Sequence, residues 1–162
     1  MARFDIKAFL PHIALVALAA LLIGGLFSLA QTEQKKTRDI IRMQEALGIR
    51  SALQLYYINH AAYPPSPNGP FEVGANDQTC LSDTGFVPTI SDSCAKKAYS
   101  RVLPVAPRIV PQDAYIYTPL GENGVDPCTS SAACPHFSIS VTFETGVLYS
   151  KGTHIVTDQG MR

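Results

Sequence analysis

Four cysteines provide the clearest chemical signal in the sequence. They lie in the second half of the 162-residue chain, at Cys80, Cys94, Cys128 and Cys134, without a C-x-x-C pair. Zinc sites favour closer ligand pairs, so we expect two disulfide bonds rather than a metal centre. Three pairings are open, of which the sequence-local one, Cys80 with Cys94 and Cys128 with Cys134, is the simplest. Disulfides in turn predict an oxidising compartment for this half of the chain.

Signatures of catalysis are missing from the sequence. The four histidines are scattered, and no nucleophile-elbow, zinc-protease, phosphate-loop or dinucleotide-binding motif occurs. No two carboxylates have a spacing that suggests acid–base chemistry, so we expect a protein that is not an enzyme. Oxygen ligands gather in one loop, at Glu122 and Asp126, although such turns are usually only solvated.

Charge and proline content divide the chain into two parts. Thirteen basic residues balance thirteen acidic ones, which argues against a nucleic-acid partner. The first 50 residues nevertheless carry a net charge of +3, and the rest carry −3. Only Pro11 of the twelve prolines precedes Pro64, so a helix-compatible part is joined to a turn-rich part.

An uncharged apolar run near the N-terminus predicts a membrane span. Residues 8–30 contain no charged side chain and exceed the roughly 20 apolar residues that a bilayer requires. We therefore expect a cytoplasmic tail over 1–7 and a transmembrane helix over 8–31, with the lipid membrane as a partner. A cleavable signal peptide is the alternative, but this run is longer than a typical signal core and continues as helix.

Residues 32–62 predict an amphipathic stem helix, because they contain no proline and a single glycine. Its first turns are rich in charged residues, including Asp39 and Arg42, and we expect these turns to be solvated. Its second half gains an apolar stripe that should pack on a sheet. The packing residues expected here and at the end of the helix are Leu47, Leu53, Tyr56, Tyr57, Tyr63 and Pro64.

The proline-rich stretch from Pro64 begins an extracytoplasmic globular region over 63–162. Alternating residues predict an antiparallel meander, whereas residues 71–112 show few convincing strands. The expected strands are 114–118, 137–143, 147–150 and 154–157. Gly146 should supply the positive φ of a hairpin turn between two of them. The resulting fold class is α+β, with a long N-terminal helix packed on a small, disulfide-stapled antiparallel sheet.

Two signals disagree about topology. Four basic residues follow the span within twelve positions, whereas only Arg3 and Lys7 precede it, and this count places the C-terminal side in the cytoplasm. The cysteines place it outside. We give the cysteines more weight, because a seven-residue tail can hold only a few charges.

In this order of parts, the chain resembles type IV pilins and the pseudopilins of type II secretion. The sharpest resemblance covers residues 46–64, where an apolar-periodic helix end, the Leu55-Tyr56 step and the Tyr63-Pro64 pair follow the family pattern. The start departs from that pattern. No glycine precedes the hydrophobic segment and no glutamate occurs before Glu33, so the chain resembles a divergent member without the usual prepilin peptidase site.

The resemblance implies a structural or assembly subunit of a surface filament or secretion system, with other pilin-like subunits as partners. Calcium binding in a loop near the sheet, which some pseudopilins show, makes Glu122 and Asp126 candidate calcium ligands. The alternative function is a membrane-tethered extracytoplasmic binding module, such as an adhesin or accessory protein, that does not polymerise. Neighbouring genes for a prepilin peptidase or an assembly ATPase would favour the filament.

Overall fold

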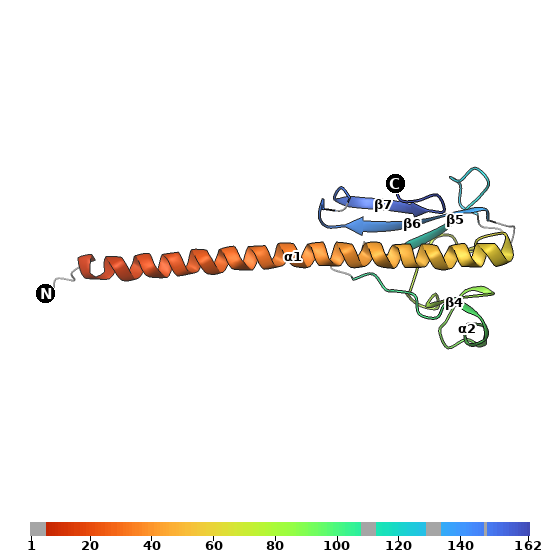
Figure 1. The fold of residues 1–162 in the computed structure, drawn as a ribbon, viewed down its shortest axis with the longest axis horizontal. Coiled ribbons are helices and arrows are strands. Elements are labelled where there is room, and N and C mark those ends of the chain that lie inside the picture. Colours follow the sequence, from red (N-terminus) through yellow and green to blue (C-terminus); the bar gives the residue numbers. More distant parts are fainter. Residues whose placement is uncertain (1–5, 108–112, 129–133, 148) are drawn as a thin grey trace. The chain divides into compact units, whose positions relative to one another are not determined.

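A computed structural model describes the backbone of residues 6–107, 113–128, 134–147 and 149–162, and side chains from Leu15 onward (Figure 1). The chain divides into two compact units, Met1–Thr37 and Arg38–Arg162. The described part of the first unit is helical, and the second unit contains the end of that helix together with the strands that the structure describes.

Helix α1 spans Ile6–His60, which has the same length of 55 residues as the span and stem predicted over 8–62 but begins two residues earlier. Within the first unit, its apolar side chains from Leu15 to Leu29 are exposed. The helix ends two residues earlier than expected. Ala61 adopts a left-handed φ of 55° while its N–H still bonds to the Tyr57 carbonyl at 2.7 Å, and the prolines that follow exclude further helix.

The larger sheet of the second unit has the strand order β1-β5-β6-β7, and all neighbouring strands are antiparallel. Its strands are β1 (Phe71–Glu72), β5 (Ile116–Leu120), β6 (His136–Phe143) and β7 (Gly152–Thr157). Strands β5, β6 and β7 form the meander that alternation predicts. Along β6, every second residue is buried, which is the period-2 pattern of a sheet with one covered face.

The connection between β6 and β7 differs from the expected one. Among the described residues of 147–150, none is in a strand, and Leu148 lies outside the described residues. Gly146 does not have a positive φ; Gly152 does, at 130°, and it opens β7. The alternation in this stretch therefore belongs to a longer turn rather than to an additional strand.

A second sheet lies in the stretch where the sequence showed few strands. It has the order β3-β2-β4 and is formed by β2 (Cys80–Ser82), β3 (Gly85–Val87) and β4 (Ala98–Ser100). A short helix, α2 (Asp92–Lys96), connects β3 to β4 and carries Cys94. Each strand has three residues, which is too few for alternation to emerge from the sequence.

One core joins α1 to the larger sheet. It contains Ile49, Leu53 and Tyr56 from the helix, and Phe137, Ile139, Val141 and Phe143 from β6. An N-terminal apolar helix packed against antiparallel sheets, with two disulfides, confirms the predicted α+β class and is a pilin-like architecture.

The packed face of α1 is turned slightly from the predicted one. Leu53, Tyr56, Tyr63 and Pro64 are buried, but Leu47 is only half-buried and Tyr57 is 38% exposed. The buried positions follow alternating steps of three and four residues, which skip both of those side chains. The positions on these steps are Asp39, Arg42, Ala46, Ile49, Leu53 and Tyr56, and Ala52 beside Leu53 is buried as well.

Candidate functional site

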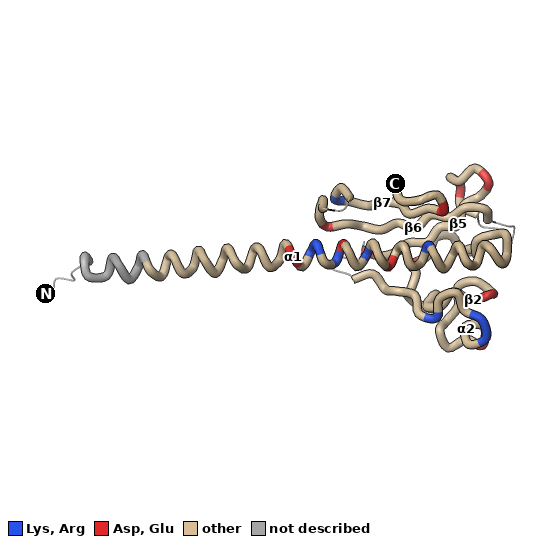
Figure 2. The backbone as a smooth tube through the Cα atoms, in the orientation of Figure 1, with Lys and Arg blue, Asp and Glu red and all other residues tan. Residues whose placement is uncertain are grey.

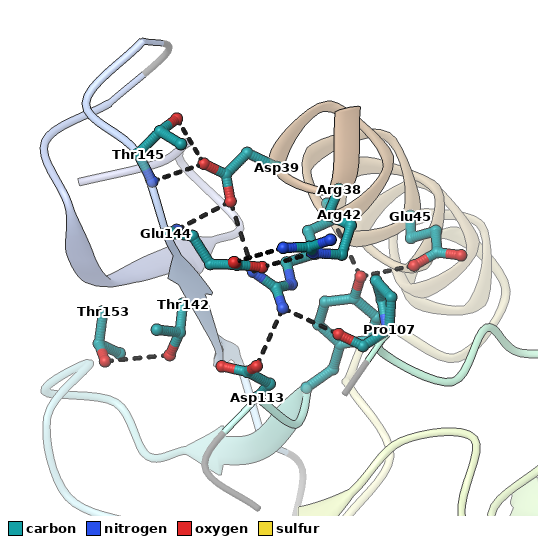
Figure 3. Close-up of polar contacts among 11 residues, drawn as sticks. Arg38, Asp39, Arg42, Glu45, Pro107, Asp113, Thr142, Glu144, Thr145 and Thr153 are labelled. Carbon is teal, nitrogen blue, oxygen red and sulfur yellow. Dashed lines mark hydrogen bonds and ion pairs between the residues drawn. The ribbon is translucent and has the colours of Figure 1, made fainter. Parts of the chain in front are cut away.

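Two of the buried positions on α1 are charged, contrary to the solvated first turns that the sequence predicts. The carboxylate of Asp39 faces the turn that follows β6 (Figure 3). It accepts the backbone N–H groups of Glu144 and Thr145, both at 2.8 Å, and the Thr145 hydroxyl at 2.6 Å. Successive N–H groups in a turn form an anion-binding nest, which Asp39 fills. The turn is thereby fixed to the helix.

Arg42 lies one helical turn further along α1 and is 1% exposed. Its guanidinium contacts Glu144 at 2.9 Å and Asp113 at 3.0 Å, and it donates to the Pro107 carbonyl at 2.8 Å. It also approaches Asp39 at 3.4 Å. A planar guanidinium with several donors can join such separate acceptors, which the single ammonium of lysine could not do in the same geometry.

Arg38 completes this ion network, which we define as Arg38, Asp39, Arg42, Asp113 and Glu144. Two nitrogens of Arg38 donate to the two carboxylate oxygens of Glu144, at 2.8 and 2.7 Å. That bidentate pairing lowers the pKa of Glu144 below its ordinary value and raises the pKa of Arg38. Both groups are therefore ionised at neutral pH.

The chemistry of the network suits a structural role, in which charged side chains hold parts of the chain in place. Arginines do not give up a proton near neutral pH, and the carboxylate oxygens face donors from the helix and the turn. Arg42 Nε is buried without an acceptor among the described residues. Removing one member would leave a buried charge uncompensated, which costs more than a surface pair contributes. The network holds the turn after β6 and Asp113 on α1.

Sequence reasoning missed the network because it treated charged residues as solvated. The spacing of the buried charged residues along α1 did indicate that they face the core. Asp39 and Arg42 continue the same three- and four-residue steps that place Ala46, Ile49 and Leu53 in the core. Nothing in the local sequence marks Asp113 or Glu144 as their partners, because both lie about 70 or more residues further along the chain.

Both disulfide bonds have the sequence-local pairing. Cys80 of β2 is bonded to Cys94 of α2, and Cys128 is bonded to Cys134 across the stretch between β5 and β6. No cysteine is free. Each bond closes a short loop, which removes entropy from the unfolded chain and stabilises a small domain.

The candidate calcium loop is exposed from Glu122 to Asp126. Asn123 organises it: its side-chain oxygen accepts the N–H groups of Val125 and Asp126, and its amide donates to the Asp126 carboxylate at 2.6 Å. No group of three or more acidic, histidine or cysteine side chains with metal-site geometry occurs in the described part of the chain. The Glu122 and Asp126 calcium site remains a prediction.

A second polar cluster, which the sequence did not indicate, surrounds Asp83. One oxygen of its carboxylate forms an ion pair with the Lys97 ammonium at 2.7 Å and accepts a hydrogen bond from the Tyr99 hydroxyl at 2.9 Å. The same oxygen lies 3.0 Å from His60 Nε2. Bonding to Lys97 and Tyr99 lowers the pKa of Asp83 to about 2. The His60 ring stacks on Tyr56 at 4.2 Å. This cluster ties the end of α1 to the smaller sheet.

The first unit supplies one further feature relevant to function. The part of α1 between Leu15 and Thr32 carries no charged residue, as Figure 2 shows, and its large apolar side chains are exposed. Among the described residues, α1 is the one helix that is long and apolar enough to cross a membrane. The segment therefore fits a lipid environment by length and composition.

Comparisons with protein-family models, with curated proteins and with solved structures give no match to this chain.

Proposed function

We propose that the protein is a membrane-anchored, pilin-like structural or assembly subunit of a surface filament or secretion system. One observation carries the proposal: α1 combines an exposed apolar segment with a segment that buries one stripe in the core of a disulfide-stapled domain. In a solvated spacer, no such stripe would be buried. The resemblance at residues 46–64 supports the same assignment.

Our proposal places Arg38–Arg162 outside the cytoplasm. Both disulfides lie in this unit, and such bonds persist in oxidising compartments. The basic residues after the span favour the opposite orientation, but two of them, Arg38 and Arg42, pair with Glu144. The charge count therefore overstates the free positive charge after the span.

Assembly is tested by photo-cross-linking in cells of the native host. A photoreactive phenylalanine analogue replaces Leu22, which is 61% exposed in the apolar segment. A subunit that assembles gives a ladder of cross-linked products whose members contain further copies or other pilin-like chains. A matched analogue at Leu18, also exposed and one helical turn earlier, checks that a negative result is not specific to one position.

A tethered binding module behaves differently in the same experiment. Irradiation then gives the monomer or adducts with lipid at both positions, with no ladder. That result would contradict the proposed assembly role while leaving the membrane anchor intact.

A further inference from the structure

The face of the larger sheet that is turned away from α1 carries a hollow of about 490 Å³. Leu120, Val125 and Ile155 supply its apolar lining. Val125 is 74% exposed and Ile155 is 46% exposed, so this apolar surface faces solvent. Exposed apolar surface gathered in a hollow is typical of a contact site for another chain.

Charged residues of both signs flank the hollow. Arg162 lines it from the tail that follows β7 and is exposed. Glu122 and Asp126 are exposed in the loop after β5, which also supplies Val125, and Figure 2 shows the acidic residues of this loop. A partner that complements this surface needs an apolar side chain with a basic and an acidic group beside it.

The disulfide-closed segment that leads into α2 offers these three groups. Ile90 is 96% exposed, the largest value among the large hydrophobic side chains that the structure describes. Asp92 and Lys96 are the first and last residues of α2, and both are exposed. Because they are four residues apart, they lie on one face of the helix. We define the α2 knob as Ile90, Asp92 and Lys96.

Covalent and capping contacts hold the α2 knob in place. The Cys80–Cys94 disulfide ties α2 to β2. The Ser91 side chain caps α2 by accepting the Cys94 N–H at 3.2 Å, and the Ser91 N–H donates to the Pro88 carbonyl at 3.0 Å. A segment that is already ordered loses less conformational entropy when it binds a partner.

Within the second unit, α2 and β7 lie on opposite sides of α1 (Figure 1). A chain therefore does not fill its own hollow with its own knob. When one surface of a chain binds a different surface of an identical chain, the contact is heterologous, and it extends into a filament if its rotation does not close a ring. Copies joined through the α2 knob and the hollow would form such a series.

We propose that the α2 knob of one copy docks in the hollow of a second copy. Ile90 enters between Val125 and Ile155, Lys96 lies beside the acidic loop, and Asp92 lies beside Arg162. The inference rests on the assembly role proposed above and names the two surfaces through which copies of the chain join.

Photo-cross-linking from the hollow tests this contact in membranes of the native host. An uncharged lysine analogue that carries a diazirine replaces Thr153, which lines the hollow and is exposed. We expect a cross-linked dimer of the full chain, and mass spectrometry should place the second attachment point in residues 88–96 of the other copy.

Ile90→Asp should lower the yield of this dimer by at least about tenfold, because a buried isoleucine side chain contributes that much to an association. Ile90→Ser, which adds no charge, should lower the yield as well. Ile58→Asp is the matched control, since Ile58 is 76% exposed on α1, and it should leave the yield unchanged. Near-ultraviolet circular dichroism of each purified variant shows that the domain is folded.

A charge exchange tests the orientation of the knob. Lys96→Glu places like charges together and should lower the yield up to about fivefold, the upper range for an exposed ion pair. Adding Glu122→Lys to the same chain restores opposite charges at the contact and should recover the yield. A double variant no better than Lys96→Glu alone would overturn the proposed orientation of the knob.

The cross-link at Leu22 separates failure of this contact from failure of assembly. If Leu22 gives a ladder while Thr153 gives no dimer, or a dimer that folded Ile90→Asp does not reduce, the knob contact is wrong and the assembly role stands. If neither position gives a dimer, the assembly role itself is contradicted.

Discussion

The carboxylate of Asp39 accepts both the backbone N–H and the hydroxyl of Thr145, at 2.8 and 2.6 Å, across 106 positions of sequence. This relationship connects the first packed turn of α1 to the turn after β6. Because Asp39 is buried, its charge is stabilised by these donors and not by water. Helix and sheet are thus joined at one end by a polar contact and along their length by apolar packing.

Replacing Asp39 with Asn tests that contact. The amide offers one acceptor oxygen and turns N–H donors toward groups that are themselves donors. We expect the free energy of unfolding to fall by about 3 to 5 kcal/mol, the usual cost of breaking a buried charge pair. Denaturant unfolding of the full chain in detergent micelles, followed by near-ultraviolet circular dichroism, measures the change.

Glu33→Gln is the matched control for Asp39→Asn. Glu33 pairs with Lys36 at 2.7 Å on the helix surface, and such pairs contribute about 0 to 1 kcal/mol. If Asp39→Asn cost no more than this control, the contact between Asp39 and the turn would not stabilise the domain.

The packed stripe of α1 makes a second prediction. Leu53 is fully buried, and Leu53→Ala should lower the free energy of unfolding by about 2 to 5 kcal/mol through lost burial and a cavity. Leu55, two residues further on, is 50% exposed. Leu55→Ala should therefore change the free energy of unfolding by only about 0.5 kcal/mol. The same unfolding measurement compares the two variants. Similar costs would show that α1 has no preferred packed face.

Lowering the pH should destabilise the folded protein, because protonation of the Glu144 carboxylate weakens the ion network. Its pKa is below the ordinary value of 4.5 in the folded protein, mainly because Arg38 donates to its carboxylate. The stability that Glu144 contributes is therefore complete above that ordinary pKa, and it is lost as the pH falls through the lower folded value. A series of denaturant unfolding curves at decreasing pH should show this loss.

Glu144→Gln isolates the contribution of that carboxylate. The variant should be less stable at neutral pH, and its difference from the parent chain should shrink as the pH falls below 4.5. Asp83, whose pKa is lowered to about 2, titrates in both proteins and so cancels in the comparison. A difference that stayed constant with pH would show that Glu144 is not ionised in the network.

The elements that the sequence predicted are those with a repeating local signal. Strand β6 is eight residues long and alternates, and the apolar positions of α1 recur at helical spacing. The smaller sheet escaped prediction because strands of three residues, such as β2, cannot show a period. The turn before β7 was misread because Val147 and Tyr149 alternate like a strand while forming none.

The site was harder to predict than the fold. Asp39 and Arg42 looked like surface residues because ionic side chains are rarely buried without partners. Their partners come from distant segments that only the tertiary structure brings together, so spacing along the chain could not reveal them. The cysteine pairing was accessible because short loops close most readily.

We propose that Arg38–Arg162 folds on the extracytoplasmic side of a membrane that α1 crosses once. Labelling of single added cysteines in intact spheroplasts with a membrane-impermeant maleimide tests it most directly, with Gln159→Cys in an exposed position of the second unit and Ala2→Cys in the N-terminal tail. We expect labelling of Gln159→Cys in intact spheroplasts, and of Ala2→Cys only after the membrane is permeabilised. Labelling of Ala2→Cys alone in intact cells would contradict it.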